Sequence, residues 1–185
     1  MPDPNLFLGN LLVLLGALGV LAGLLVLRFP AALRAGLAAF PRSKWPGWIL
    51  TAVCVFWVAW VIRHAALGRF EVVKPLIPVL ALVGFGAIVW FLDELLAPRA
   101  LGGLLLLLAN PMLNGVRWSE STWRFAVVLI AYAWVVAGCI LMLHPWGFRR
   151  LAGKFLVSTA WLRAAGWGKV LAGAVLVAAG LWHLR

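Results

Sequence analysis

An apolar run near the N-terminus most constrains what this chain can form. From Leu6 to Leu27, 22 residues carry one polar side chain, Asn10. A helix of that length measures about 33 Å and can cross a hydrocarbon core of about 30 Å. Hydrophobic residues make up 65% of the 185 residues and charged residues only 11%, which leaves too few polar side chains to cover a soluble fold. The sequence predicts a single all-α integral membrane domain over residues 1–185.

Five further runs bring the number of predicted transmembrane helices to six. They are Gly47 to about Leu67, Pro75 to Leu92, Leu95 to Leu113, Phe125 to Leu143, and Ala165 to Leu184. The most apolar part of the fourth run is Leu101 to Leu113. As a helix this part measures about 20 Å, which is too short to cross a membrane alone. Counting from Leu95 gives sufficient length, whereas a break at Asn110-Pro111 would make a re-entrant segment. The first run follows Asp3 and no basic residue, so we interpret it as a retained span rather than a signal peptide.

In chain order the six spans predict three hairpins, at about 5–68, 72–115 and 123–185. Amphipathic helices at the membrane interface are expected within the first and last hairpins, the first with Phe29, Leu33 and Leu37 on one face. Residues 22–30 align with 137–145 at Ala-Gly and at Pro without a gap. This alignment suggests an internal repeat, although leucine-rich spans also match by chance.

The basic residues lie between the apolar runs. The chain has 16 Lys and Arg against 5 Asp and Glu, and in that position the basic residues set orientation and meet anionic lipid rather than nucleic acid. The loops after spans one, three and five hold 10 of them and the opposite side 6, which predicts both termini outside a bacterial inner (plasma) membrane. The side chains expected at lipid headgroups are Arg34, Arg42, Lys44, Arg149, Arg150 and Lys154.

Glycines recur every seventh residue in the first and last spans. A small residue at each repeat lets a second helix approach closely, within the chain or between copies, and Gly19 with Gly23 adds a GxxxG pattern. Coincidence is the alternative, because the chain has 19 glycines. The residues predicted at helix contacts are Gly9, Gly16, Gly19, Gly23, Gly166, Gly173 and Gly180.

Residues with catalytic or ligand-binding potential are few. His64 and His183 end two spans that should reach the same face and could hold a haem or a metal, although two isolated interfacial histidines are the commoner arrangement. Ser119, Ser121 and Thr122 have no histidine near them in the sequence, and no nucleophile, zinc or phosphate-loop motif occurs. No cofactor is therefore predicted, and no enzymatic activity.

The predicted function follows from this lack of reactive groups and from the glycine pattern. We expect a non-catalytic accessory or scaffold subunit of a larger membrane complex, which contacts partner helices or copies of itself and anionic lipid. A small channel or transporter, formed by oligomerisation or between the repeats, is the alternative. The lack of a mid-span carboxylate argues against coupling to protons or sodium, and a lipid-modifying enzyme is a more distant third.

Overall fold

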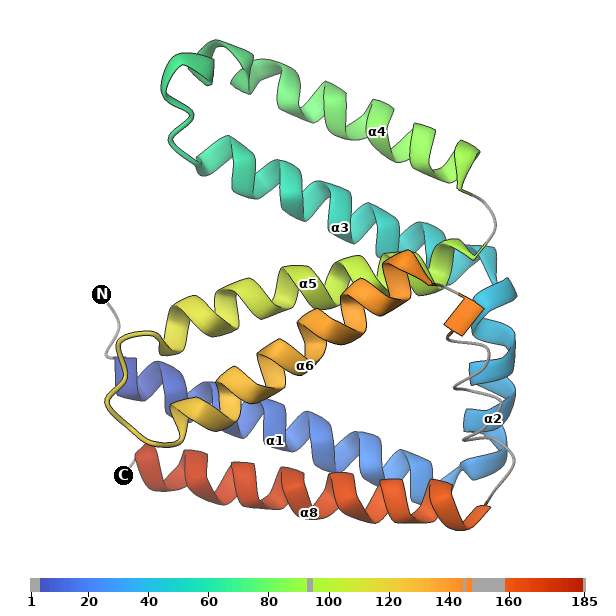
Figure 1. Cartoon of the computed structure of the whole chain (residues 1–185), viewed down its shortest axis with the longest axis vertical. Coiled ribbons are helices and arrows are strands. Elements are labelled where there is room, and N and C mark those ends of the chain that lie inside the picture. The colour runs from blue at the N-terminus through green and yellow to red at the C-terminus, as the bar shows by residue number, and fades with distance from the viewer. Residues whose placement is uncertain (1–3, 93–94, 145, 148–158, 185) are drawn as a thin grey trace.

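The computed structural model describes residues 4–92, 95–144, 146–147 and 159–184, and this part of the chain contains helices and no strand (Figure 1). The α-helices are α1 (Pro4–Arg28), α2 (Pro30–Ala39), α3 (Lys44–His64), α4 (Ile77–Phe91), α5 (Leu96–Val116), α6 (Arg124–Leu143) and α8 (Thr159–His183). Two 3-10 helices, η1 (Phe40–Arg42) and η2 (Gly68–Leu76), precede α3 and α4.

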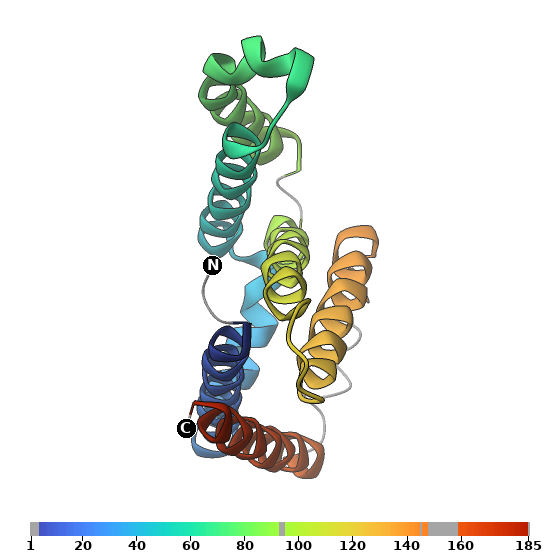
Figure 2. The same cartoon turned by 90° about the vertical axis from the view of Figure 1, so that its left-hand side faces the viewer.

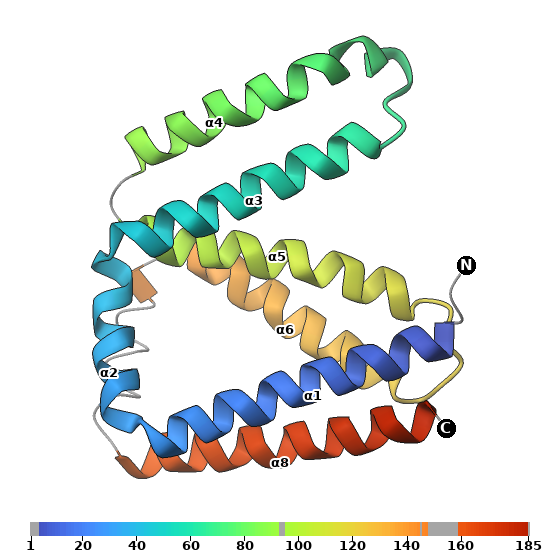
Figure 3. The same cartoon turned by 180° about the vertical axis from the view of Figure 1, so that it is seen from behind.

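Six of these helices are long and apolar enough to cross a membrane. They are α1, α3, α5, α6 and α8, together with a helix from Glu71 to Phe91 that combines most of η2 with α4. The predictions of an all-helical chain and of six candidate spans are confirmed. The helices alternate in direction, so Pro4 of α1 and His183 of α8 begin and end the described chain at the same end of the bundle (Figures 1 and 3).

The ambiguous fourth run forms one continuous helix. α5 spans 21 residues and includes both Pro98 and Pro111. Pro98 lies in the first turn, where the missing amide proton costs least, so the helix begins well before Leu101. Pro111 interrupts one backbone hydrogen bond without ending the helix, and Asn114 Nδ2 donates to Asn110 Oδ1 at 3.1 Å across the same turn. The expected break at Asn110-Pro111, on which the re-entrant alternative depends, is therefore absent from α5.

The most extensive helix contacts are not those of the three hairpins expected from chain order. α4 packs against α3, α3 against α5 and α5 against α6, while α1 packs against α8 along its whole length and also contacts α5 (Figures 1 and 2). The hairpins at 5–68, 72–115 and 123–185 would pair α1 with α3, α4 with α5 and α6 with α8. The observed pairing differs because the small-residue faces that permit close approach lie on α1 and α8 and on α5 and α6.

The core lies toward the end of the bundle that carries Pro4 and His183. Four helices contribute buried side chains to it: α1, α5, α6 and α8. Its members are Leu8, Leu12, Ala109, Met112, Val116, Val127, Ala131 and Ala179. The opposite end is crossed by α2, none of whose residues is buried. Placement of α2 at a membrane interface stays a prediction, and residues 148–158, where the second amphipathic helix is expected, lie outside the described residues.

Candidate functional site

The glycines of α1 and α8 meet one another in antiparallel register. A Cβ atom added at Gly16 would lie 2.6 Å from the Gly173 carbonyl oxygen, and one added at Gly173 would lie 2.6 Å from the Gly16 oxygen. Such distances are shorter than real Cβ contacts, so only glycine fits. We call the three pairs the glycine seam: Gly9 with Gly180, Gly16 with Gly173, and Gly23 with Gly166.

Gly19 belongs to the rim of this seam rather than to its centre. A Cβ there would lie 3.5 Å from the Gly173 Cα, which is ordinary van der Waals contact. The heptad spacing therefore identifies the glycines that the packing requires, whereas the GxxxG pattern adds one that a small side chain can replace. The contact is within the chain, which is one of the two arrangements that the glycine spacing predicts.

A second close contact, between α5 and α6, has no counterpart in the sequence analysis. A Cβ at Gly102 would lie 2.7 Å from the Gly138 oxygen, and the reverse distance is also 2.7 Å. One glycine on each helix produces no period, so the spacing of residues could not reveal it. Gly138 appears in the sequence analysis only through the repeat alignment, where it matches Gly23.

Polar side chains join α1, α8 and the loop before α6 at the end of the bundle where α8 finishes. Ser119 is fully buried, and its hydroxyl donates to Asn5 Oδ1 at 2.9 Å while its carbonyl accepts from Arg124 at 2.8 Å. Ser121 Oγ lies 2.6 Å from His183 Nε2. No histidine is near Ser121 in the sequence, but folding brings it to His183, 62 residues away. We call Asn5, Ser119, Ser121, Arg124 and His183 the polar clasp.

The hydrogen bonds of His183 indicate a structural role for this pair. The ring Nδ1 donates to the Ala179 carbonyl at 2.9 Å, so in the neutral ring Nε2 accepts the proton of the Ser121 hydroxyl. Ser121 Oγ in turn accepts the Trp123 backbone N–H at 3.2 Å. Each polar atom of the pair thus has a partner, and the pair ties the loop before α6 to the last turn of α8.

Replacing either member of this pair should destabilise the protein. Ser121→Ala or His183→Ala leaves the other partner short of a hydrogen bond, so we expect a loss of about 1–3 kcal/mol in the free energy of unfolding. The double variant should lose little more than the worse single variant, because both remove one interaction. Thermal unfolding in detergent measures the losses. Ser43→Ala is the control, because Ser43 makes no side-chain capping bond, and additive losses would contradict the pairing.

The structure does not bring His64 and His183 together. His64 ends α3, donates from Nδ1 to the Trp60 carbonyl at 2.8 Å and lies over the Trp60 ring with centroids 4.2 Å apart. α3 and α8 lie at different edges of the bundle, with α5, α6 and α1 between them (Figure 1). Among the described residues no three His, Cys, Asp or Glu side chains form a group that could hold a metal ion. The geometry gives the haem idea no support.

Two arginines at the end of the bundle crossed by α2 have buried guanidinium atoms. Arg34 Nε and Nη2 and Arg99 Nε have no hydrogen-bond partner among the described residues. A buried cationic donor is stabilised by an anion with oxygen acceptors, such as a lipid phosphate. Arg42 and Lys44, by contrast, are exposed. Arg149, Arg150 and Lys154 lie outside the described residues, as do Asp93 and Glu94.

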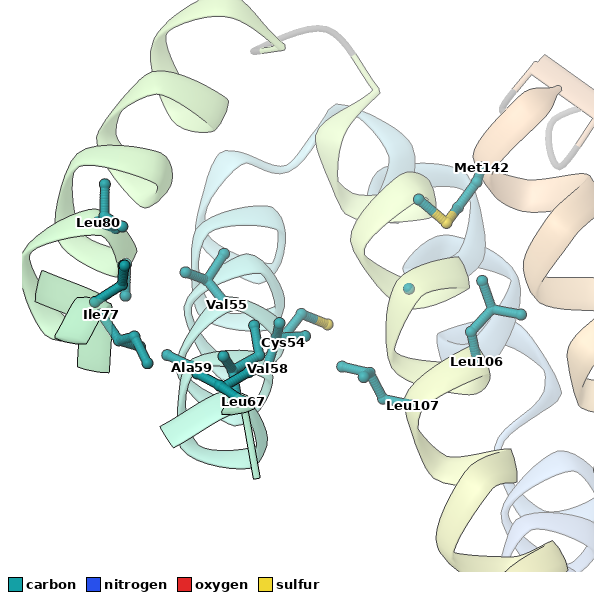
Figure 4. Close-up of a pocket in the computed structure, with 14 residues that line it drawn as sticks. Cys54, Val55, Val58, Ala59, Leu67, Ile77, Leu80, Leu106, Leu107 and Met142 are labelled. Carbon is teal, nitrogen blue, oxygen red and sulfur yellow. The ribbon is translucent and has the colours of Figure 1, made fainter. Parts of the chain in front are cut away.

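A cavity of about 710 Å³ lies between α3, α4 and α5 and was not predicted (Figure 4). Figure 4 shows Val55 and Val58 of α3 between Ile77 of α4 and Leu107 of α5. Cys54 also lines it, and its thiol donates to the Ala100 carbonyl at 3.5 Å. The lining comes from α3, α4 and α5, from the segment between α3 and α4, and from Met142 of α6. It depends on how these helices pack, so no local pattern could identify it.

Comparison of the chain with protein-family models, with curated proteins and with solved structures gives no match.

Proposed function

We propose that this membrane-embedded protein is a non-catalytic accessory or scaffold subunit of a larger membrane assembly. The observation that carries the proposal is the uncovered face of α4. Among the described helices α4 packs extensively only against α3, and only Ile77 and Ala81 of its residues are buried. Trp90 and Phe91 at its end are 84% and 81% exposed.

Small residues on α4 leave room for another helix. A Cβ at Gly84 or Gly86 would meet no described atom within 4 Å, whereas the glycine seam is filled from within the chain. Inside a membrane, helices associate through close packing at small residues rather than through the hydrophobic effect. α4 is therefore the helix best suited to receive a partner.

Contact with anionic lipid forms the second part of the proposal. The nitrogens of Arg34 and Arg99 that have no hydrogen-bond partner among the described residues support it, since a headgroup phosphate offers several acceptor oxygens to a guanidinium group. Arg42, at the end of η1, and Lys44, at the start of α3, add exposed positive charge. Basic residues next to a membrane gain about 1 kcal/mol each from anionic lipid.

A small channel or transporter is the alternative, and the predicted internal repeat favours it. α1 ends at Arg28 and α6 ends at Leu143, which differ by the same shift as the aligned residues 22 and 137. The residues that follow these two helices also share a backbone conformation: φ −128° and ψ 55° at Phe29, φ −128° and ψ 63° at His144. Repeated units are common in transporters.

Native purification from membranes, with mass analysis of the co-migrating chains, tests the main proposal. We expect a second chain or a second copy at a fixed ratio. The double variant Gly84→Leu and Gly86→Leu should retain roughly tenfold less of this second chain or copy, because leucine side chains block the close approach of another helix. Gly168→Leu is the control, because a Cβ at Gly168 in α8 also meets no described atom within 4 Å. A protein that always purifies alone would contradict the proposal.

A further inference from the structure

The cavity between α3, α4 and α5 has a use that the proposed function does not assign. Its volume of about 710 Å³ lies within the roughly 300–1,000 Å³ of small-molecule sites. Along α3 its lining extends from Cys54 to Ile62, which corresponds to about 12 Å of helix. At Leu67 and Val73 it reaches the loop between α3 and α4. The cavity thus extends from the middle of α3 to the segment between α3 and α4.

The lining selects a flexible hydrocarbon. All 14 lining residues are aliphatic, glycine or sulfur-containing, and none of them carries a charge or an aromatic ring. The Cys54 thiol already donates to the Ala100 carbonyl. A polar ligand would lose its hydrogen bonds with water and gain none here, whereas methylene groups would be well solvated by the aliphatic side chains.

The cavity is open to the membrane because α4 does not pack extensively against α5. Figure 4 shows Leu80 of α4 and Leu106 of α5 on opposite sides of the space, with α3 between the two helices. In a bilayer the material beside this gap is lipid hydrocarbon. A lipid chain can therefore reach the cavity from the side without crossing a polar surface.

Positive charge lies beside the end of the cavity. Arg63 follows the lining residue Ile62, and Arg69 lies in η2 before the lining residue Val73. Both arginines are exposed. Lys74 is already held by Glu71, with 2.7 Å between Nζ and Oε2, so the two arginines account for the net positive charge near this opening. Arginine binds phosphate through paired N–H donors.

We propose that this cavity binds an acyl chain of an anionic glycerophospholipid, whose phosphate is held by Arg63 and Arg69. The acyl chain lies among α3, α4 and α5, and the headgroup lies at the loop between α3 and α4. This inference rests on the lipid contact within the proposed function and does not depend on a partner protein.

Native mass spectrometry of the full-length protein, purified in mild detergent and supplied with phosphatidylglycerol or phosphatidylcholine, tests the site. A Cβ at Gly103 would lie 3.7 Å from the Cys54 Sγ, which is ordinary van der Waals contact, and Gly103 lines the cavity. Gly103→Leu is therefore expected to take up cavity volume. It should weaken retention of phosphatidylglycerol on the order of tenfold, the effect of displacing about two methylene groups. Gly168→Leu, on the outer face of α8, should retain lipid as the unmodified protein does.

The arginines are tested by their selectivity. The double variant Arg63→Gln and Arg69→Gln should retain both lipids equally, whereas the unmodified protein should prefer phosphatidylglycerol by about tenfold. Arg117→Gln is the control, because Arg117 is also an exposed basic residue but follows α5, away from the cavity lining. Equal retention of the two lipids by the unmodified protein would overturn the headgroup assignment.

Crosslinking identifies the occupant directly, even if Gly103→Leu fails to fold. A benzophenone maleimide attached to Cys54 in a Cys139→Ala background should crosslink to phosphatidylglycerol in nanodiscs. Crosslinks to a second copy, to a partner chain or only to α4 would overturn the proposal. The partner capture described above can fail while this lipid crosslink is still obtained, so failure of the assembly proposal and failure of the lipid site are distinguishable.

Discussion

Adding a single methyl group at Gly16 or Gly173 is expected to lower the free energy of unfolding by about 1–3 kcal/mol, as overpacking does in other tightly packed sites. Each added Cβ would lie 2.6 Å from a carbonyl oxygen of the facing helix, and a backbone atom cannot move aside as a side chain can. α1 and α8 must therefore separate along their contact. Gly16→Leu and Gly173→Leu should have larger effects. Thermal or denaturant unfolding followed by circular dichroism in detergent measures the loss.

Two alanine substitutions provide matched controls within the same helices. Gly19→Ala places its methyl 3.5 Å from the nearest backbone atom, and Gly168→Ala places its methyl in open space. Both should leave stability unchanged or slightly raised, since alanine favours helix over glycine. Gly68, the first residue of η2, is not a suitable control because its φ of 54° would strain any other residue. Equal losses at Gly16 and Gly19 would show that the seam does not determine stability.

Labelling of intact cells should give an all-or-none result for the two termini. We predict that cysteines introduced at Asp3 and at Arg185 react with a membrane-impermeant maleimide, because the more basic loops are retained in the cytoplasm. The structure is compatible with a shared side, since α1 begins and α8 ends at the same end of the bundle. The experiment needs Cys54→Ala and Cys139→Ala, because Cys139 is exposed on α6.

The opposite end of the bundle supplies the control for this labelling. Arg42→Cys, in η1, should react only after the cells are permeabilised. Reaction at Arg42 together with protection at both termini would reverse the orientation. Different results at residues 3 and 185 would contradict an even number of crossings.

The positions of the spans could be predicted because they depend on local composition. The length of α1 follows directly from the run Leu6 to Leu27, and even α5 was within reach once Pro98 was placed in a first turn. The seam was partly predictable, because heptad spacing identifies a helix face. The spacing cannot show which helix fills that face, and here Gly16 meets Gly173 rather than a second copy of the chain.

The remaining features depend on residues that are far apart in sequence. Ser121 and His183 belong to no motif, and their contact exists only because the last turn of α8 reaches the loop before α6. Only Gly102 of α5 and Gly138 of α6 take part in their close contact, so no repeated spacing reveals it. The cavity requires α4 to diverge from α5, although the two helices are consecutive and were expected to form a hairpin. Sequence periodicity therefore could not predict which helices pack against one another.

The pairing of the first span with the last has a consequence for biosynthesis. Membrane helices are inserted one after another as the chain is made, and they associate afterwards. The glycine face of α1 must therefore remain without its final partner until α2 to α6 have been synthesised and α8 has entered the bilayer. A ribosome that stops before α8 would leave an incomplete bundle with that face open. Closure of the seam thus follows the synthesis of every helix between α1 and α8.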